Sequence, residues 1–285
     1  MKPAAFDYVA PASVDEALAC LAQREGAKVL AGGQSLVPML ALRLAAPAWL
    51  VDVNRIAELS GVHLAASGEL VIGAATRQRT LERSALIAKA NPLLAAAMPW
   101  IAHVQIRNRG TLGGSLAHAD PAAELPGVCL ACDAVLTLQS RRARREVAAA
   151  QFFRGMFETA LAADELLTQV RFPAWPAHRA HAFLEVARRH GDFAICGIAV
   201  TADRDAQGRI GDCRIVAIGV EDRPVRLAAA ERALAGSKGD PAAIEAAAKA
   251  ASAGLQARQD LHASAQYRVE LVEVLTRRAL LRALR

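Results

Sequence analysis

The sequence is poor in aromatic residues and contains no long apolar run. Aromatic side chains make up 4% of its 285 residues, although 54% of the residues are hydrophobic. The longest apolar stretch, Leu30 to Leu50, is interrupted by glycines, prolines and an arginine. It therefore falls short of the roughly 20 apolar residues that a membrane helix needs. The start of the chain also lacks the apolar segment of a signal peptide. These absences predict a globular, cytoplasmic protein without a membrane span.

The five cysteines do not suggest a metal site or a disulfide framework. Cys129 and Cys132 are separated by two residues, but no second cysteine pair and no histidine pair accompanies them. A zinc or iron–sulfur site needs about four ligands. We therefore predict buried thiols on a helix. If the protein works with an iron–sulfur cluster, another chain has to hold it.

The usual nucleotide and nucleic-acid signatures are also missing. No G-x-G-x-x-G follows an apparent strand and no G-x-x-x-x-G-K-[ST] occurs, which disfavours a Rossmann domain and a nucleoside triphosphatase. The net charge of +6 raises the question of nucleic-acid binding. The one dense basic run, Arg141–Arg145, has no interleaved aromatic residues. We interpret it as a solvated hairpin turn, with a docking surface for an acidic partner as the alternative, and expect no nucleic acid.

The pattern of apolar residues changes along the chain. The first half alternates helix-like and strand-like segments, and Ser13 and Glu16 form a capping box before the first helix. Breakers at residues 172–176 mark a domain boundary, which gives units 1–176 and 177–285. Strands followed by helices predict an α+β unit after this boundary. The expected strands are 182–188, 194–202 and 213–220, and the expected helices are 228–235, 241–253 and 264–284.

Two glycine loops are the strongest candidates for a ligand site. Residues 29–36 read VLAGGQSL and residues 111–115 read TLGGS. Each loop pairs adjacent glycines with a hydroxyl residue, so that backbone amides can approach an anion closely. The loops are about 80 residues apart. Their convergence would suit the two phosphates of a dinucleotide.

In combination, the two loops resemble the FAD-binding subunits of bacterial molybdenum hydroxylases. The segments VLAGGQSLVPML and HVQIRNRGTLGGSLAHADPAAELP carry the resemblance. The segment FLEVARRHGDFAICGIAV is similar to part of the C-terminal domain of the same family. This family includes the medium chain of carbon monoxide dehydrogenase and the FAD segment of xanthine dehydrogenase. The resemblance covers nearly the whole chain.

The resemblance implies a fold, a cofactor and partners. The implied fold is α+β, with a two-subdomain FAD-binding fold of the vanillyl-alcohol oxidase type, then a three-stranded antiparallel sheet and a helical bundle. This chain would hold FAD, a large subunit a molybdenum–pterin cofactor, and a small subunit two-iron–two-sulfur clusters, in a dimer of heterotrimers. Electrons would pass from the clusters through FAD to an external acceptor. The alternative is a stand-alone FAD-dependent oxidoreductase of the same superfamily.

The resemblance also assigns cofactor contacts. An acidic contact about ten positions beyond the second loop corresponds to Glu124 by spacing, with Asp120 as its rival. Phe193 stands where some relatives have a tyrosine against the isoalloxazine ring. Leu184 stands where some have a lysine, so no contact is assigned to it. No catalytic or metal-binding residue is assigned to this chain. The expected FAD-binding residues are Val29, Leu30, Ala31, Gly32, Gly33, Gln34, Ser35, Leu36, Thr111, Leu112, Gly113, Gly114, Ser115 and Glu124.

Overall fold

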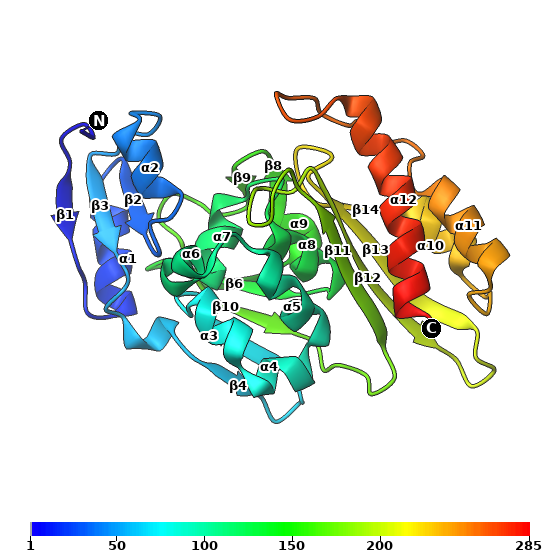
Figure 1. Cartoon of the computed structure of the whole chain (residues 1–285). Helices are drawn as coiled ribbons and strands as arrows, with labels where there is room; N and C mark the ends of the chain where they lie inside the picture. Colours follow the sequence, from blue (N-terminus) through cyan, green and yellow to red (C-terminus); the bar gives the residue numbers. More distant parts are fainter. Residues whose placement is uncertain (1) are drawn as a thin grey trace.

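The N-terminal unit is a small parallel sheet with a helix packed on it. The computed structural model describes residues 2–285, and this unit lies at one end of the molecule (Figure 1, blue). Strand β3 is central and pairs in parallel with both β1 and β2. The elements are β1 (Asp7–Val9), α1 (Val14–Gln23), β2 (Ala27–Leu30), α2 (Leu36–Ala41) and β3 (Trp49–Asp52).

Helix α1 begins where its capping residues predict. The Ser13 hydroxyl accepts a hydrogen bond from the Glu16 amide at 3.2 Å, and Glu16 Oε2 accepts one from the Ala12 amide at 2.7 Å. The first bond satisfies a donor that the first turn of a helix leaves free, and the second ties Glu16 to the residue before the cap. The buried face of α1 consists of the apolar residues at helical spacing, Val14, Ala17, Leu18 and Leu21.

The second unit is built on a five-stranded antiparallel sheet. Its order is β4-β5-β10-β6-β7, so the strand that comes last in the chain lies at the centre. The separate ribbon of β8 and β9 lies beside it. The strands are β4 (Val62–Leu64), β5 (Leu70–Gly73), β6 (Val135–Gln139), β7 (Arg144–Ala148), β8 (Phe153–Gly155), β9 (Glu158–Thr159) and β10 (Leu166–Phe172).

The basic run lies at the tip of a hairpin, as predicted. Arg141 and Arg142 lie in the turn between the antiparallel strands β6 and β7, and Arg144 and Arg145 begin β7. Arg141 and Arg142 are exposed, whereas Arg145 is paired with Glu165 at 2.7 Å. A cavity of about 390 Å³ lies beside the tip, between Arg141, Arg142 and the end of α1.

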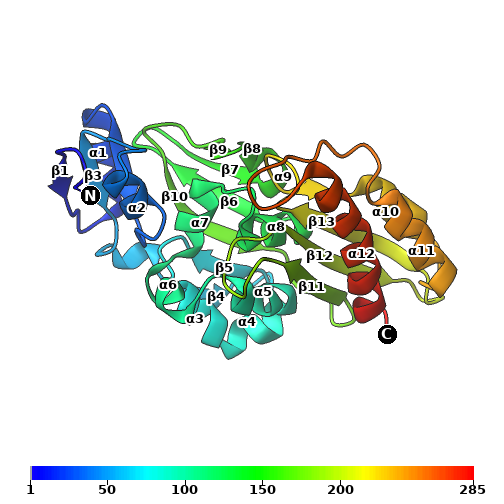
Figure 2. The same cartoon turned by 45° about the horizontal axis from the view of Figure 1, so that its top comes forward.

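Short helices carry the chain across one face of the five-stranded sheet (Figure 2). Cys129 lies in α8 and Cys132 at its C-terminal end, and both are buried. Burial raises the pKa of the Cys132 thiol to about 12. The prediction of buried thiols is confirmed. The helical segments are η1 (Ala57–Leu59), α3 (Gln78–Arg83), α4 (Ala85–Ala90), α5 (Pro92–Ala97), η2 (Met98–Trp100), α6 (Val104–Arg109), α7 (Leu112–His118), α8 (Glu124–Ala131) and α9 (Ala149–Phe152).

The C-terminal unit is an antiparallel sheet with three helices on one face. The order of its strands is β11-β12-β13-β14, and α12 crosses the sheet with α10 and α11 beside it (Figures 1 and 2). The elements are β11 (Ala180–Val186), β12 (Cys196–Arg204), β13 (Ile210–Ile218), β14 (Val225–Arg226), α10 (Ala228–Leu234), α11 (Pro241–Ala250) and α12 (Ala265–Ala283).

This sheet has one strand more than the sequence predicts. The three long strands lie close to the expected segments, but β14 adds a fourth by pairing Val225 with Ala217 and Arg226 with Val216. A two-residue strand is too short to show an alternating pattern of apolar and polar residues. The prediction of a three-stranded sheet is therefore wrong, while the antiparallel arrangement and the three helices after it are confirmed.

Both faces of the C-terminal sheet are buried. Successive residues of a strand point to opposite faces. Phe183 and Ile218 accordingly join the core of the second unit, whereas Ala182 and Ala217 join the core under the helices. Gly127 of α8 permits a close approach to the sheet, because a Cβ there would lie 2.5 Å from Ile218 Cγ2. One face of the C-terminal sheet thus belongs to the hydrophobic core of the second unit, and the other face belongs to a separate core under the helices.

Candidate functional site

The first glycine loop connects β2 to α2. Val29 and Leu30 end the strand, Leu36 begins the helix, and residues 31–35 form the bend between them. The backbone amides of residues 32–35 donate no hydrogen bond to any residue between 2 and 285. Four successive unpaired amides form a concavity suited to an anion such as a phosphate.

Two local features keep this bend open. Gly33 has a φ of +74°, a conformation that side-chain-bearing residues rarely adopt. The Gln34 side chain folds back on the bend, where its Nε2 donates to the Gly32 carbonyl at 3.1 Å. The carbonyls of the bend are thereby turned toward the protein's own donors, and the amide row is left for a ligand.

Thr111 begins the second glycine loop and caps α7. Its Oγ1 accepts a hydrogen bond from the Gly114 amide at 3.0 Å, and its carbonyl accepts one from the Ser115 amide at 3.2 Å. The side chain of Ser115 is partly exposed and forms no hydrogen bond with residues 2–285. Its hydroxyl is available to a ligand.

Two more amides of the second loop, besides those of Gly114 and Ser115, are satisfied inside the protein. The Leu112 and Gly113 amides donate to the carbonyls of Thr76 and Ala74 at 3.0 and 2.7 Å. A Cβ on Gly113 would lie 2.5 Å from Ala74 Cβ, so glycine is needed here for close packing. The expectation that each loop presents a row of amides therefore holds for the first loop only.

The two loops adjoin, as the sequence predicts. A Cβ on Gly32 would lie 2.7 Å from Gly110 Cα, directly before the second loop. A Cβ on Gly114 would lie 3.4 Å from Ala31 Cβ. Glycine at position 32 thus allows the backbones of the two loops to touch. Segments about 80 residues apart in the sequence therefore lie side by side.

Arg77 and Asn54 link the two loops through a side-chain network. Asn54 Nδ2 donates to the Ala31 carbonyl at 2.7 Å, and its Oδ1 accepts a hydrogen bond from Arg77 NH2 at 2.7 Å. Arg77 NH1 donates to the Arg109 carbonyl, and Arg77 forms an isolated antiparallel bridge with Thr111. Sequence reasoning missed both linking residues, although a polar residue directly after the buried strand β3 was a usable signal for Asn54.

We expect Arg77→Met to loosen this junction. The variant loses two hydrogen bonds from a charged group, which lowers the free energy of unfolding by about 1–3 kcal/mol and FAD affinity by about tenfold. Urea unfolding and titration of the flavin-free chain with FAD measure the two effects. Arg83→Met is the control, since Arg83 is exposed on the same helix. Equal affinities in the two variants would contradict the linking role.

Of the two acidic candidates, Glu124 is enclosed and Asp120 is not. Glu124 starts α8 with 7% of its surface exposed. Burial raises the pKa of Glu124 to about 7, and the nearby charge of Asp120 adds to this rise. Asp120 is partly exposed and its Oδ1 accepts a hydrogen bond from the Ala122 amide at 2.9 Å. Asp120 uses only Oδ1 to close a turn, so the assignment of Glu124 stays a prediction.

Phe193 projects from the loop between β11 and β12. Its side chain is 68% exposed, and the Ile195 amide closes the base of the loop on the Val186 carbonyl at 2.8 Å. Gly191 lets this loop lie on His103, because a Cβ there would be 2.6 Å from His103 Nδ1. Leu184 packs against the core under the helices.

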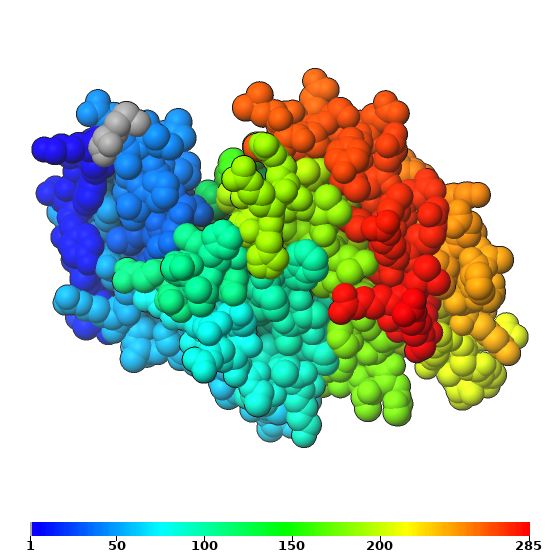
Figure 3. Space-filling model, viewed as in Figure 1, coloured from blue at the N-terminus to red at the C-terminus, as the bar shows by residue number. Residues whose placement is uncertain are grey.

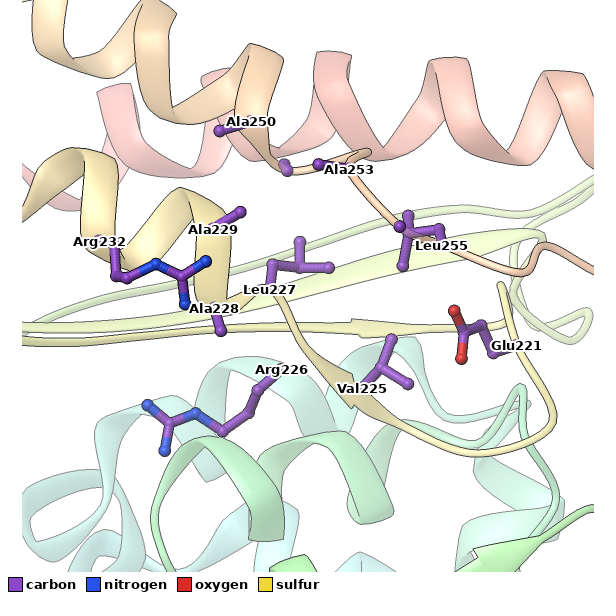
Figure 4. Close-up of a pocket in the computed structure, with 12 residues that line it drawn as sticks. Glu221, Val225, Arg226, Leu227, Ala228, Ala229, Arg232, Ala250, Ala253 and Leu255 are labelled. Carbon is purple, nitrogen blue, oxygen red and sulfur yellow. The ribbon is translucent and has the colours of Figure 1, made fainter.

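Figure 3 shows a notch between the N-terminal unit and the loops of the C-terminal unit. A separate cavity of about 310 Å³ lies between β14, α10 and the end of α11 (Figure 4). It is lined mainly by alanine and leucine, and Arg226 at its wall is paired with Glu231 at 2.7 Å. It contains no residue of the glycine loops, so it is distinct from the candidate site.

Two further features concern the part of the chain that the structure describes. None of its helices combines the length and the apolar character of a membrane span. Its His, Cys, Asp and Glu side chains nowhere gather in a group of three or more that could hold a metal ion.

Comparison with known proteins identifies the family. Residues 4–175 match the family described as "FAD binding domain in molybdopterin dehydrogenase", and residues 181–283 match "CO dehydrogenase flavoprotein C-terminal domain". The chain is 43% identical to the alpha subunit of the 6-hydroxypseudooxynicotine dehydrogenase complex of Paenarthrobacter nicotinovorans, over 100% of this chain and 96% of the relative. It is 42% identical to the nicotine 6-hydroxylase medium subunit of the same organism, over 99% of each chain.

A solved structure agrees with these matches. Carbon monoxide dehydrogenase from Hydrogenophaga pseudoflava, in a form that lacks the Mo-pyranopterin moiety of the molybdenum cofactor, contains a chain with 40% identity and a TM-score of 0.96. The similarity covers 99% of this chain and 98% of that one. The chain therefore belongs to the FAD-binding medium subunits of the molybdopterin hydroxylases, the oxidoreductase family of carbon monoxide dehydrogenase and xanthine dehydrogenase.

Proposed function

We propose that this chain binds one FAD across its two glycine loops and passes electrons from partner iron–sulfur clusters to an external acceptor. The observation that carries the proposal is the contact at Gly32, which joins a row of four free amides to the second loop. Amides in such a row suit the diphosphate of a dinucleotide. The residues present therefore fit FAD.

The proposed contacts come from three parts of the chain. The first loop contributes its amides and the second loop the Thr111 amide and the Ser115 hydroxyl, while Glu124 supplies a carboxyl. Phe193 presents an apolar ring without a hydroxyl, so it can pack on a flat ligand without hydrogen-bonding to it. The proposed set is Val29, Leu30, Ala31, Gly32, Gly33, Gln34, Ser35, Leu36, Thr111, Leu112, Gly113, Gly114, Ser115 and Glu124.

We propose that partner subunits carry out the chemistry on the substrate. When bound, FAD supplies the redox chemistry, and the chain binds it, orients it and limits its exposure to water. A large molybdenum subunit and a small iron–sulfur subunit complete the proposed heterotrimer, which we propose to form dimers. Two of the relatives belong to enzymes that are named after nicotine and carbon monoxide, which are chemically very different. This range supports a role for the present chain that does not depend on the substrate.

We also propose the division of the chain at residue 176 and a fold of the vanillyl-alcohol oxidase type for the first part. The family matches end at residue 175 and resume at residue 181, which supports the boundary. The parallel sheet and the antiparallel sheet of the first part support two FAD-binding subdomains.

Flavin content and electron transfer test the proposal. The chain, assembled with its molybdenum and iron–sulfur subunits, is expected to release one FAD per chain on denaturation. In stopped-flow absorbance measurements without oxygen, substrate is expected to bleach the flavin only when the iron–sulfur subunit is present. An assembled complex without flavin would rule the proposal out. Substrate turnover by the single chain would instead establish the stand-alone oxidoreductase.

A further inference from the structure

A short series of hydrogen bonds connects the edge of the N-terminal sheet to the first glycine loop. It starts at Tyr8 of β1, whose hydroxyl donates to Asp52 Oδ2 at 2.6 Å. Asp52 ends β3, and its Oδ1 accepts hydrogen bonds from the Asn54 backbone amide at 2.8 Å and from Asn54 Nδ2 at 2.5 Å. Asn54 Nδ2 also donates to the Ala31 carbonyl at 2.7 Å. A single side chain therefore separates the carboxyl group of Asp52 from the first loop.

Asp52 fixes which way the side-chain amide of Asn54 faces. The amide nitrogen can only donate and the amide oxygen can only accept. The nitrogen lies against two acceptors, Asp52 Oδ1 and the Ala31 carbonyl, whereas the oxygen accepts from Arg77 NH2 at 2.7 Å. A rotated amide would place its oxygen against two acceptors and its nitrogen against a cation. Burial alone would raise the pKa of Asp52, but the hydrogen bonds from Tyr8 and Asn54 hold it below the ordinary value of 3.8, so the group is a carboxylate at neutral pH.

The Ala31 carbonyl that Asn54 holds belongs to the same peptide unit as the Gly32 amide. This peptide bond is trans, so its C=O and N–H groups point in opposite directions. Because the carbonyl is bound to Asn54, the Gly32 N–H points away from Asn54, and it donates to no residue between 2 and 285. The Asn54 side chain therefore sets the direction of the first amide in the row.

The next two peptide units of the bend are held by neighbours in the sequence. The Gly32 carbonyl accepts a hydrogen bond from Gln34 Nε2 at 3.1 Å, and the Gly33 carbonyl accepts one from the Val37 amide at 3.1 Å. Three successive units are thus anchored by their carbonyls, and the N–H groups opposite are left for a ligand. Of these three, the first is anchored from another element, so its direction depends on what holds Asn54.

We propose that Asp52 is a positioning residue of the FAD site, which orients the Asn54 amide and through it aims the Gly32 amide at the diphosphate of FAD. This inference rests on the proposed function, because FAD is the proposed ligand of the amide row. Asp52 acts through Asn54 and the Ala31 carbonyl. Without the carboxylate, the Asn54 amide is free to rotate, and the peptide unit that it holds loses its fixed direction.

Nuclear magnetic resonance of the flavin-free full chain tests the orientation directly. Alanine labelled at its carbonyl carbon and glycine labelled at its nitrogen give signals only from Ala–Gly peptide bonds in a spectrum that selects linked pairs. The sequence contains three such bonds, at residues 31–32, 235–236 and 253–254. We expect Asp52→Ala and Asn54→Ala to shift the signal of the first bond, because its carbonyl loses a fixed donor, and to leave the other two in place. Ala31→Ser deletes that signal and so identifies it.

Two control variants separate positioning from a general structural effect. Asp52→Asn keeps a side-chain oxygen that can accept from Asn54, so its signal for the first bond should stay close to that of the wild type. Asp7→Ala removes an exposed carboxylate from the neighbouring strand β1 and should move none of the three signals. A carboxylate that only stabilised the sheet would lower the urea midpoint of Asp52→Ala without this selective shift. An unshifted first signal in Asp52→Ala would overturn the inference.

Titration of the flavin-free chain with FAD tests the link to the cofactor. Asp52→Ala and Asn54→Ala are each expected to weaken binding about tenfold, the effect of losing one well-aimed hydrogen bond to a charged group. Because Asp52 acts through Asn54, the double variant should bind FAD like Asn54→Ala alone. Additive losses of about 100-fold in the double variant, or equal affinities for Asp52→Ala and Asp7→Ala, overturn the inference alone. A wild-type chain that binds no FAD overturns the proposed function and this inference with it.

Discussion

Gly32→Ala is expected to weaken FAD binding about 10- to 100-fold, because the methyl group forces the two glycine loops apart. The added Cβ would lie 2.7 Å from the Gly110 Cα and closer still to the Arg109 carbonyl oxygen. Both are backbone atoms, so no side-chain rotation can move them aside. Separation of the backbones also strains the Asn54 and Arg77 network that spans the junction. Gly32→Val should have a larger effect than Gly32→Ala.

The comparison variant for this experiment is Gly211→Ala. Gly211 lies in β13, with no atom within 4 Å of an added Cβ and no left-handed backbone conformation. It should therefore bind FAD like the wild type. Titration of the flavin-free chain with FAD, followed by flavin fluorescence, gives both affinities. If Gly32→Ala bound FAD as tightly as Gly211→Ala, the contact between the loops would not be what holds the cofactor site together.

The meeting of the two loops was predictable from the sequence, whereas the chemistry of each loop was not. Adjacent glycines signal a close backbone approach, and the structure places Gly32 against Gly110. The same pattern says nothing about where the amides point. The Gly113 amide is bound to the Ala74 carbonyl, and Ala74 is remote from any recognised motif. A glycine needed for packing and a glycine needed for a ligand look identical in a sequence.

The residues that sequence reasoning missed are those whose roles depend on distant partners. Arg77 directly precedes the short helix α3, and nothing near it in the sequence indicates that Asn54 lies beside it in the fold. Glu185 is a buried carboxyl group on the mostly apolar strand AHAFLEV, and a charged residue on a buried face was a usable signal. No spacing rule connects residues on separate units.

Arg268→Met is expected to lower the free energy of unfolding by about 3–6 kcal/mol, because two buried carbonyls lose hydrogen bonds from a charged group, each of which contributes about 1.5–3 kcal/mol. Arg268 lies on α12 with 1% of its side chain exposed. Its NH1 donates to the carbonyls of Ile195 and Gly219, each at 2.6 Å, and its NH2 donates to Asp260 Oδ2 at 2.5 Å. In the variant these three acceptors lose a donor, and two of them are buried carbonyls.

The position of Arg268 extends this effect to the proposed cofactor site. Ile195 closes the loop of Phe193, and the Gly219 amide donates to the Pro121 carbonyl, just before Glu124. Loss of the guanidinium should therefore weaken FAD binding as well as stability. Arg278→Met, at an exposed position on the same helix, is the control. Arg268→Lys keeps the charge but not the geometry of two parallel donors, so its stability should lie between those of Arg268→Met and the wild type. Urea unfolding curves that are equal for Arg268→Met and Arg278→Met would show that the C-terminal helix does not hold these loops in place.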